Sequence, residues 1–592
     1  MTTFHEVSLI NQGYTCKIPD GGLLSDLIKG ENLPFGFPCN GRGMCGKCRV
    51  KVSGPVSDPT PAELKRLNRE ELSSGVRLAC QVRLLGPVIV EILGAADSLN
   101  ILIEGFPEVI PADPISGHPS ARRIIIPAAA TLNWENLNNY IPSQVAPSLH
   151  ILQKLPLVSK DAGELSLALI ENQVVALKPS ADMKTIYGVG VDVGTTTLAA
   201  YLVDALEGQI MQTAVAVNPQ GSYGADVISR IGLTGEPEGL ERLHQLIIGA
   251  VNELIRELAQ KAGINSEEIL ELNLVGNTCM THLLLKVNPA QLGKLPFEPV
   301  FKGLVKMAAT DLGFSINPNG LVHVLPGIGG FIGSDITVGV WACKLSPDKP
   351  ELFIDIGTNG EVVVTGKGKM VAGSTAAGPA FEGAGIACGM TAKPGAISGV
   401  QFQDGRLMVT TIDNVAPRGI CGTGLIRLIV ELKRKGIITD SGRFTEEAVT
   451  DPNLDREQKR YYLARNGSTA VYLSDHDLRQ IQLAKAAFRA GWTLLLGRVG
   501  LEPGELETVY LAGAFGTFLR AEDAVFLGLI PPVPLERIKP VGNTAGIGTV
   551  LSMLSKDALS ELGSLSARIE PVELAGDPRF MDVFTEGLLF EL

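Results

Sequence analysis

The sequence predicts a multidomain chain of mixed α/β architecture. We expect a small β-rich domain at residues 1–94, a linker at 95–121, a small α/β middle domain at 122–184 and a large two-lobed α/β domain at 185–592. Three observations predict this division. Four cysteines lie in the first domain, prolines gather in the linker, and an Asp-Gly-Thr pattern occurs twice in the last segment. A chain of 592 residues has room for several domains at one per ~150 residues.

Composition limits the classes of partner. The chain is 45% hydrophobic and 19% charged, with a net charge of −12, which argues against a nucleic-acid partner and against an anionic membrane surface. The most apolar long stretch, 321–340, contains Pro326 and Asp335 and does not predict a membrane-spanning helix. His5 and Glu6 stand where a signal peptide would be basic and apolar. Nine cysteines are too few for a disulfide scaffold of this length, so we expect a cytoplasmic protein.

The cysteine spacing points to a metal–sulfur site. Cys39, Cys45 and Cys48 stand within ten residues, with glycines between them, and Cys80 follows later. This C-x5-C-x2-C…C spacing differs from the plant-type [2Fe–2S] spacing by one residue, and it does not match the bacterial [4Fe–4S] run. A structural zinc site would usually have two C-x2–4-C pairs, whereas this segment has one. The spacing therefore favours a [2Fe–2S] cluster, with zinc as the alternative.

The flanking residues are typical of a small β-rich fold. Residues 4–10 and 13–18 predict a hairpin, 23–29 a short helix and 87–93 a closing strand. Together with the cysteine motif, these features resemble a [2Fe–2S] ferredoxin domain of the β-grasp type. The resemblance implies that the cluster ligands are Cys39, Cys45, Cys48 and Cys80.

The next two segments carry little chemistry. The proline-rich residues 95–121 predict a semi-extended linker. Residues 122–184 predict three short strands and one helix near Trp134–Tyr140, which we interpret as a small α/β domain.

An internal repeat marks the large domain. The two copies contain Asp192-Val-Gly-Thr-Thr-Thr197 and Asp355-Ile-Gly-Thr-Asn-Gly360, each between apolar strands. A turn of Gly and Thr directs N–H groups and hydroxyls toward an anion such as a phosphate. An Asp at the end of the preceding strand can hold Mg²⁺, directly or through water. The repeat predicts two similar lobes, about 185–345 and 346–592, that hold nucleotide phosphates in a cleft between them.

Further strands and helices support this interpretation. Helices are expected near 238–262 and 477–499, each followed by an apolar strand that ends in a small-residue turn. The segment 185–592 resembles the RNase H-like actin/Hsp70/sugar-kinase (ASKHA) superfamily of ATP-binding proteins. The resemblance implies that the catalytic residues are Asp192 and Asp355. It implies ATP contacts at Gly194, Thr195, Thr196, Thr197, Gly357, Thr358, Asn359, Gly360, Gly513 and Gly516. It also implies connecting motifs where helices of the two lobes cross, for which 329–335 and 419–424 are the candidates.

Single polar residues leave alternatives open. Asp335 and Asp226 could each orient an attacking water or cap a helix, and for Asp335 we favour the cap. Glu382 lies between glycines and could face the cleft or solvent. His282 and His323 have no ligand partners in the sequence, which favours structural roles.

An iron–sulfur cluster and an ATP site in one chain indicate an electron transfer to an acceptor of lower potential, which ATP can drive. Plant-type [2Fe–2S] centres lie near about −400 mV, and each ~100 mV below that costs about 2.3 kcal/mol per electron. The whole chain resembles the reductive activators of corrinoid proteins, including the activating enzymes of corrinoid-dependent O-demethylases. The resemblance implies ATP-dependent reduction of Co(II) to Co(I) in a corrinoid protein partner. It also implies an external low-potential reductant and a homodimer formed through the C-terminal domain.

Three other functions stay open at this point. A small-molecule kinase with an attached redox module would need a pocket for a phosphoryl acceptor. A nucleotide-gated scaffold would bind ATP with negligible turnover. An activator of a radical or dehydratase enzyme usually shares a [4Fe–4S] cluster across a dimer, which the N-terminal cysteines do not match.

Overall fold

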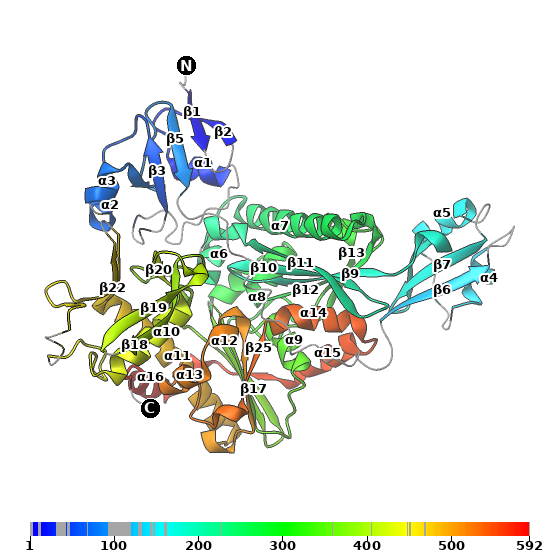
Figure 1. The fold of residues 1–592 in the computed structure, drawn as a ribbon. Coiled ribbons are helices and arrows are strands. Elements are labelled where there is room, and N and C mark those ends of the chain that lie inside the picture. Colours follow the sequence, from blue (N-terminus) through cyan, green and yellow to red (C-terminus); the bar gives the residue numbers. More distant parts are fainter. Residues whose placement is uncertain are drawn as a thin grey trace.

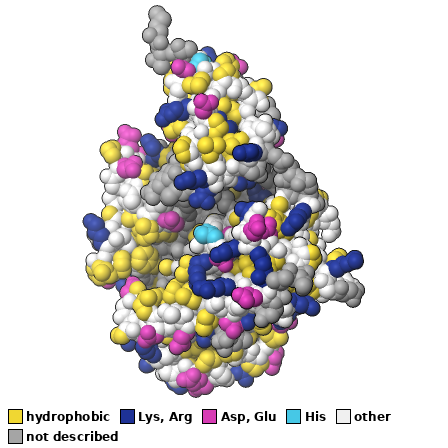
Figure 2. Space-filling view, turned by 90° about the vertical axis from the view of Figure 1, so that its left-hand side faces the viewer, with side chains coloured by type: hydrophobic (Ala, Val, Ile, Leu, Met, Phe, Trp, Pro, Cys, Tyr) yellow, Lys and Arg dark blue, Asp and Glu magenta, His cyan; other side chains and the backbone are white. Residues whose placement is uncertain are grey.

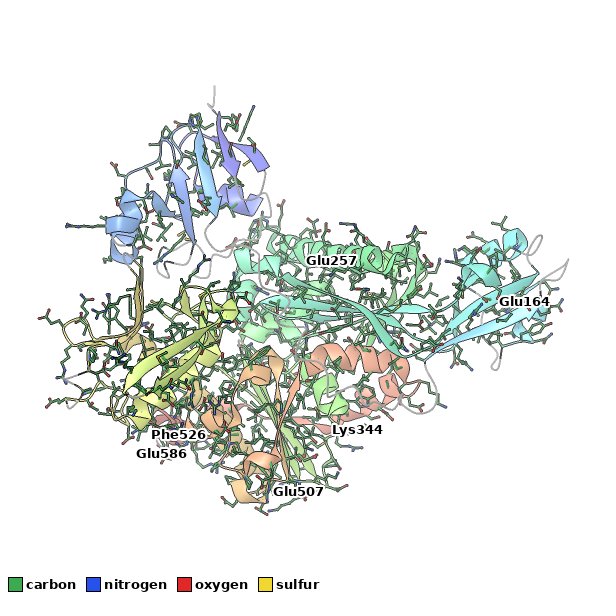
Figure 3. The ribbon with its side chains drawn as sticks, viewed as in Figure 1. Glu164, Glu257, Lys344, Glu507, Phe526 and Glu586 are labelled. Carbon is green, nitrogen blue, oxygen red and sulfur yellow. The ribbon has the colours of Figure 1, made fainter. Side chains whose placement is uncertain are left out.

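The computed structural model describes residues 4–9, 14–30, 43, 46, 48–67, 69–92, 120–127, 133–141, 145, 148–158, 163–224, 226–357, 359–403, 405–446, 448, 451–466 and 469–590. These residues form an N-terminal unit, a small unit that projects to one side, and two large lobes (Figure 1). None of the helices in these ranges combines the length and the apolar character needed to cross a membrane. Charged side chains mark the outer surface, among them Glu164, Glu257, Lys344, Glu507 and Glu586 (Figure 3).

The N-terminal unit is a five-stranded sheet in the order β2-β1-β5-β3-β4. Strands β1 and β2 form the predicted antiparallel hairpin, and β5 pairs with β1 in parallel. The bounds of its elements are β1 Phe4–Leu9, β2 Tyr14–Pro19, α1 Leu24–Gly30, β3 Arg49–Ser53, α2 Pro61–Arg66, α3 Arg69–Ser73, β4 Val76–Leu78 and β5 Val88–Ile92. The arrangement confirms the predicted β-grasp fold, and one helix packs its apolar side on the sheet through Leu24 and Ile28.

The small unit is a three-stranded antiparallel sheet in the order β6-β7-β8. Its elements are β6 Ala121–Pro127, α4 Trp134–Asn138, α5 Leu149–Val158, β7 Glu164–Ile170 and β8 Gln173–Pro179. Leucines and isoleucines on one face of the sheet pack against α4 and α5, as the predicted α/β character requires.

The first lobe contains a six-stranded sheet in the order β11-β10-β9-β12-β14-β13. Its strands are β9 Tyr187–Val193, β10 Thr197–Asp204, β11 Gln209–Val217, β12 Ile269–Gly276, β13 Val305–Ala308 and β14 Leu321–Val324. Its helices are α6 Val227–Leu233, α7 Gly239–Ala262, α8 Thr278–Leu284 and α9 Ser334–Ala342. The predicted helix near 238–262 is α7, whose buried apolar stripe packs on this sheet.

The second lobe contains a sheet in the order β25-β24-β15-β16-β17-β26. Its strands are β15 Glu351–Ile356, β16 Gly360–Gly366, β17 Lys369–Thr375, β24 Thr508–Ala512, β25 Ile538–Gly542 and β26 Glu570–Pro571. Its helices are α10 Gly422–Arg434, α11 Asp475–Val499, α12 Gly513–Phe518, α13 Ala521–Phe526, α14 Thr544–Leu554, α15 Ala558–Arg568 and α16 Phe580–Gly587. Two small sheets accompany it: β18 Ala396–Gln403, β19 Arg406–Thr411 and β20 Gly419–Ile420, and β21 Leu454–Asp455, β22 Arg460–Asn466 and β23 Thr469–Ser474.

The predicted repeat is present in the topology of the two sheets. In the first lobe β9, β10 and β11 form an antiparallel meander, and β12 pairs with β9 in parallel. In the second lobe β15, β16 and β17 form the same meander, and β24 pairs with β15 in parallel. Asp192 and Asp355 are each the penultimate residue of the first strand. The two lobes therefore present their Asp residues at equivalent positions.

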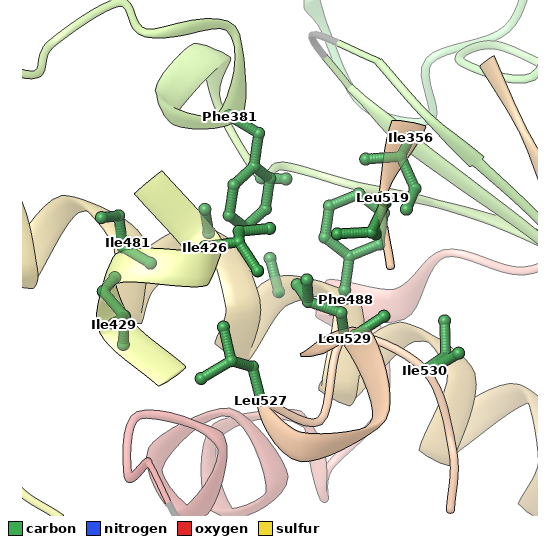
Figure 4. Packing of buried hydrophobic residues seen from close by; sticks show 14 of the residues in the cluster. Ile356, Phe381, Ile426, Ile429, Ile481, Phe488, Leu519, Leu527, Leu529 and Ile530 are labelled. Carbon is green, nitrogen blue, oxygen red and sulfur yellow. The ribbon is translucent and has the colours of Figure 1, made fainter. Parts of the chain in front are cut away.

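The largest hydrophobic cluster lies in the second lobe beneath its first hairpin. Figure 4 shows Phe381 and Phe488 packed together with Ile356, and the two ring centroids are 6.1 Å apart. Phe381 belongs to a 3₁₀ turn, Pro379–Glu382, and Phe488 to α11. This core fixes the turn that ends in Glu382 beside the repeat hairpins.

Candidate functional site

The described part of the cysteine cluster brings two of the four predicted ligands together. Cys48 precedes β3 and Cys80 follows β4, and the antiparallel pairing of these strands places the two thiols side by side. Their Sγ atoms are 3.2 Å apart, both side chains are buried, and neither is in a disulfide. Cys39 and Cys45 lie outside the described residues.

The surroundings of these thiols fit a metal–sulfur group. The Cys48 thiol donates a hydrogen bond to Cys80, and with Gln81 it lowers the pKa of Cys80 to about 6 despite burial. Thiolates are the ligands of iron–sulfur clusters. Gly43 has φ +69°, and a Cβ atom there would lie 2.9 Å from Cβ of Ala62, so only glycine suits this position. Two thiols in contact, next to a loop position that only glycine can occupy, are what a loop that binds an iron–sulfur cluster requires.

The first predicted phosphate hairpin joins β9 to β10. Gly194 to Thr196 form its turn, and Thr197 begins β10. Thr195 is buried, and its Oγ1 accepts a hydrogen bond from Nδ2 of Asn277 at 2.8 Å. Its carbonyl accepts a bond of 2.6 Å from Arg230, which is fully buried and also donates to Gly224. Burial lowers the pKa of Arg230 to about 10, so it keeps its positive charge behind the turn.

The second hairpin joins β15 to β16 and lies against Gly513, one of the two glycines of α12 that are expected to contact ATP. The N–H of Gly357 donates to the carbonyl of Asn359 at 3.2 Å, and Gly360 begins β16, while Thr358 lies outside the described residues. Gly513 begins α12, which also contains Gly516. Gly513 has φ +84°, and a Cβ atom there would lie 2.6 Å from Oδ1 of Asp355. The N-terminus of α12 therefore adjoins the second Asp.

Four carboxylic acids share the space between the hairpins. Burial, followed by the charges of Asp335 and Asp355, raises the pKa of Asp192 to about 8. Burial and Asp335 raise the pKa of Asp355 to about 7, and burial raises that of Asp335 to about 6. Burial, followed by the charges of Asp335 and Asp355, raises the pKa of Glu361 well above its usual range. Acids this close together repel one another when ionised, so they favour protonation or the binding of a cation. Within the described residues, no group of three or more His, Cys, Asp or Glu side chains is placed to hold a metal by itself.

Two of these acids, Asp335 and Glu361, and the neighbouring Asn543 were not among the predicted site residues, although Asp335 was considered as a water-orienting residue. The expectation that Asp335 caps a helix is wrong: Gly333 is the N-cap of α9, and Asp335 joins the acidic group from the first turn. Glu361 follows the glycine that begins β16, where the sequence gives no signal beyond a charge inside an apolar strand. Asn543, the N-cap of α14, hydrogen-bonds Asp192 and donates to the hydroxyl of Tyr201 at 3.3 Å.

The crossing helices of the two lobes are α9 and α14. A Cβ atom on Gly548 would lie 2.6 Å from Cβ of Val338, so glycine permits the close approach. Residues 329–335 do lead into α9, as predicted. The assignment of 419–424 is wrong, because these residues form β20 and the first turn of α10. The second crossing helix is α14, which begins at Thr544.

The remaining candidates have distinct places. Asp226 caps α6, accepting from the N–H of Ser229 at 2.7 Å. Glu382 faces the cleft, where it accepts a hydrogen bond of 3.3 Å from Thr196 of the opposite lobe. His282 is a buried structural residue of α8 that accepts from the N–H of Val300. His323 is also buried, but it has an acidic partner in the small unit, Glu171, at 2.9 Å.

A cavity of about 180 Å³ lies beyond the C-terminal end of α12. It is bounded by residues 398–401 of β18, by Thr423 and Arg427 of α10, and by Phe518 to Arg520. Arg427 forms ion pairs with Asp523 at 2.8 Å and with Glu431 at 2.9 Å. The cavity is polar and lies on the second lobe only.

Comparison with known proteins identifies each part of the chain. Family profiles match for a "2Fe-2S iron-sulfur cluster binding domain" at residues 8–85, for the "RACo middle region" at 187–348 and for the "C-terminal domain of RACo the ASKHA domain" at 349–591. The small unit at 121–179 lies between the first two matches. The zinc alternative for the cysteine motif is therefore less favoured than the [2Fe–2S] cluster.

Full-length relatives share this order of domains. The corrinoid activation enzyme RamQ of Eubacterium limosum is 32% identical over 586 residues, which cover 96% of each chain. The [Co(II) methylated amine-specific corrinoid protein] reductase of Methanosarcina barkeri is 24% identical over 65% of this chain and 73% of its own length. The solved structure of a reductive activator for corrinoid,iron-sulfur protein is 29% identical, with a TM-score of 0.73 over 99% of this chain and 98% of its own. The chain belongs to the family of corrinoid activation enzymes.

Proposed function

We propose that this protein uses ATP to reduce the cobalt of a corrinoid protein from Co(II) to Co(I), one electron at a time. The observation that carries the proposal is the full-length match to a corrinoid activation enzyme, which includes both the cysteine unit and the two lobes. The small-molecule kinase and the scaffold are less favoured, because neither accounts for a match to a corrinoid activation enzyme along the whole chain.

We propose Cys39, Cys45, Cys48 and Cys80 as the ligands of the [2Fe–2S] cluster. When bound, the cluster supplies one-electron transfer. The protein's own contribution is to keep two ligands buried and to lower the pKa of Cys80, so that a thiolate is available at neutral pH.

For the nucleotide we propose a site between the two hairpins. The N–H groups and hydroxyls of the two hairpin turns, residues 194–197 and 357–360, would bind the phosphates. Asp192 and Asp355 would hold Mg²⁺. Mg²⁺ in nucleotide sites usually takes only one or two carboxylates and keeps several waters. The raised pKa values of the two Asp side chains support this role. They show that the buried carboxylates lack a positive partner, and a divalent cation would offset both the burial and the repulsion between the acids.

Several finer points belong to the same proposal. We place the domain boundaries at 1–94, 95–121, 122–184 and 185–592, since each sheet falls within one of these ranges apart from the first residue of β6. We infer a cytoplasmic homodimer, joined through the C-terminal domain, that takes its electron from an external low-potential reductant. None of the cysteines in the described part of the chain is in a disulfide, which suits a reducing compartment.

One experiment tests the function directly. The protein is reduced with dithionite, freed of excess reductant, and mixed with a purified corrinoid protein in its Co(II) state, with and without MgATP. We expect the absorbance of Co(I) to appear only with MgATP, up to one Co(I) per reduced cluster. Formation of Co(I) at the same rate without ATP, or none under either condition, would contradict the proposal.

A further inference from the structure

Helix α2 of the ferredoxin unit presents only positive charge to solvent. A capping box begins the helix: the N–H of Glu63 donates to the Thr60 hydroxyl, and the Glu63 carboxylate accepts from the Thr60 N–H. Glu63 is fully buried and pairs with Arg77 at 2.9 Å. The sole acid of the helix is thus turned inward, while Lys65 and Arg66 are exposed.

The same helix lies directly against the cluster loop. A Cβ atom on Gly46 would lie 3.3 Å from Cβ of Arg66, and one on Gly43 would lie 2.9 Å from Ala62. Arg49 bridges the two segments, donating to the carbonyl of Gly46 at 3.1 Å and to that of Arg66 at 3.4 Å. The basic end of α2 therefore borders the segment that carries three of the proposed cluster ligands.

An exposed apolar side chain completes this surface. Leu64 is 61% exposed, which is high for a leucine, and it is flanked in sequence by Lys65 and Arg66. Arg69, at the start of α3, is exposed as well. We call these four residues, Leu64, Lys65, Arg66 and Arg69, the α2 rim. On the side of the molecule that Figure 2 shows, Lys and Arg side chains are scattered over the ferredoxin unit at the top, and a denser group lies on the part below it. An apolar centre with a charged border is the usual composition of a transient protein interface.

The charge of the rim contrasts with that of the whole chain. The full chain has a net charge of −12, whereas residues 1–92 contain eleven Lys and Arg against nine Asp and Glu. An acidic protein is therefore repelled less by the part that contains the cluster than by the rest of the molecule. Four thiolates also give a bound cluster negative charge, so attraction at its edge depends on the nearby basic side chains. Such a field can raise association rates by about 10- to 1,000-fold at low salt.

We propose that the α2 rim is the docking surface for the electron donor, and that this donor is a small electron-carrier protein of the ferredoxin or flavodoxin class with carboxylates around its redox centre. The inference rests on the proposed function and deepens it. In the docked pair one electron passes from the reduced carrier to the oxidised [2Fe–2S] cluster, and no bond is made or broken. The carrier is oxidised by one electron and the cluster is reduced by one.

Stopped-flow kinetics with the full-length protein test this assignment. The rate of cluster reduction is followed by loss of its visible absorbance, with a purified acidic flavodoxin hydroquinone as one donor and the cationic methyl viologen radical as the other. For Lys65→Glu/Arg66→Glu we expect the flavodoxin rate to fall about 10- to 100-fold at low salt. The viologen rate should not fall. Near 1 M salt, where the Debye length is about 3 Å, wild type and variant should converge.

A matched control and a second variant separate charge from folding. Lys17→Glu/Lys184→Glu makes the same change in net charge at exposed sites, one on β2 at the far edge of the sheet and one in the small unit, and should keep the flavodoxin rate within twofold. Lys65→Glu/Arg69→Glu leaves the Arg66 stem over Gly46 intact and should reproduce the defect. The EPR signal of the cluster must match wild type in every variant used.

Two results would overturn the inference. One is an unchanged flavodoxin rate in both rim variants, or an equal loss in the control. The other is a normal flavodoxin rate combined with slower Co(I) formation by pre-reduced rim variants, which would assign the rim to the corrinoid protein. The first result does not depend on the proposed function, because it follows only the reduction of the cluster. The second is measured once the wild type has been shown to form Co(I), which tests the proposed function separately.

Discussion

The hydroxyl of Thr196 donates a hydrogen bond to Oε2 of Glu382 across the cleft, at 3.3 Å. Thr196 belongs to the phosphate hairpin of the first lobe, and Glu382 ends the 3₁₀ turn of the second. That turn is anchored by Phe381, whose ring stacks on Phe515 of α12 with centroids 5.6 Å apart. The contact therefore links the first hairpin to α12, the helix that begins at Gly513.

Glu382 should compete with a nucleotide phosphate for the Thr196 hydroxyl. A carboxylate at this position also repels the phosphate charge, at a cost of about 1 kcal/mol for a partly exposed pair. We therefore expect Glu382→Gln to lower KM for ATP about three- to tenfold, with kcat changed less than threefold. Steady-state ATPase assays measure both constants. A higher KM would show that the carboxylate assists nucleotide binding and would contradict this interpretation.

The acidic group should make the nucleotide-free protein less stable as pH rises. Asp192 has a usual pKa of 3.8 and one of about 8 in the folded protein. Between these values the folded state holds a proton that the unfolded state has released, so the free energy of unfolding falls as pH increases. Without Mg²⁺ and nucleotide, we expect the melting temperature to drop from pH 6 to pH 8.5. Calorimetry across this range checks the slope, and a rise instead of a fall would contradict it.

Removing one acid should separate stability from activity. Asp192→Asn and Asp355→Asn each relieve repulsion in the cleft but also remove a proposed Mg²⁺ ligand. We expect a flatter pH dependence and a higher melting temperature above pH 7, with ATP turnover reduced at least 100-fold. Asp226→Asn is the control, because this exposed helix cap should change neither quantity by much. An Asn variant that is both less stable and fully active would rule out the assigned role.

Cluster binding should depend on the described thiol pair and leave the lobes intact. Cys80→Ser and Cys48→Ser each remove one thiolate, so we expect loss of the reduced [2Fe–2S] EPR signal and of Co(I) formation. Basal ATP hydrolysis should stay within about twofold of wild type, because the lobes form their own cores. Cys16→Ser is the matched control, because this cysteine lies outside the cluster motif and its thiol donates to the Val7 carbonyl at 3.8 Å. Iron retained at the wild-type level in Cys80→Ser would contradict this assignment.

Regular spacing made much of the fold predictable. Alternating strands, the cysteine spacing and the duplicated Asp-Gly-Thr turn are local patterns, and they led to the β-grasp sheet, the two lobes and the equivalence of Asp192 and Asp355. Helix α11 was expected at 477–499 and begins at Asp475, two residues earlier, because Ser474 forms a capping box with Asp477.

Contacts between distant segments could not be predicted in this way. Asn543 reaches Asp192 from the start of α14, far along the chain, and carries no motif. Glu361 is a neighbour of another kind, since it lies opposite Asp355 in the same hairpin, a pairing that depends on the strand register. The second crossing helix was misplaced at 419–424 because a glycine-rich turn before an apolar helix occurs there too. What distinguishes α14 is its packing on α9, through Gly548 and Val338, which only the fold reveals.

The contact between His323 of the first lobe and Glu171 of the small unit should stabilise the protein in a pH-dependent way. Its Nε2 lies 2.9 Å from Oε1 of Glu171, in the turn between β7 and β8, and its Nδ1 lies 2.8 Å from Oδ1 of Asn273. Burial alone would lower the pKa of His323, but Glu171 and Glu271 outweigh it and raise the pKa to about 9. The His323 pairing, ahead of Lys306, lowers the pKa of Glu171 to about 2. The stabilisation is therefore complete between the usual values of 4.5 and 6.5, and it is lost as pH rises through 9 or falls through 2.

We expect His323→Gln to lower the free energy of unfolding by about 2–4 kcal/mol at pH 6, because it leaves two acids without their cation. The difference from wild type should shrink steadily above pH 7 and be small at pH 9.5, where His323 is largely neutral in both folded and unfolded protein. Lys306→Gln is the control, since it removes an exposed partner of the same Glu171 and should cost under about 1 kcal/mol. Urea unfolding at pH 6, 8 and 9.5 measures these differences. A defect in His323→Gln that stays constant from pH 6 to 9.5 would mean that the ring acts through packing, and the charge-based account would fail.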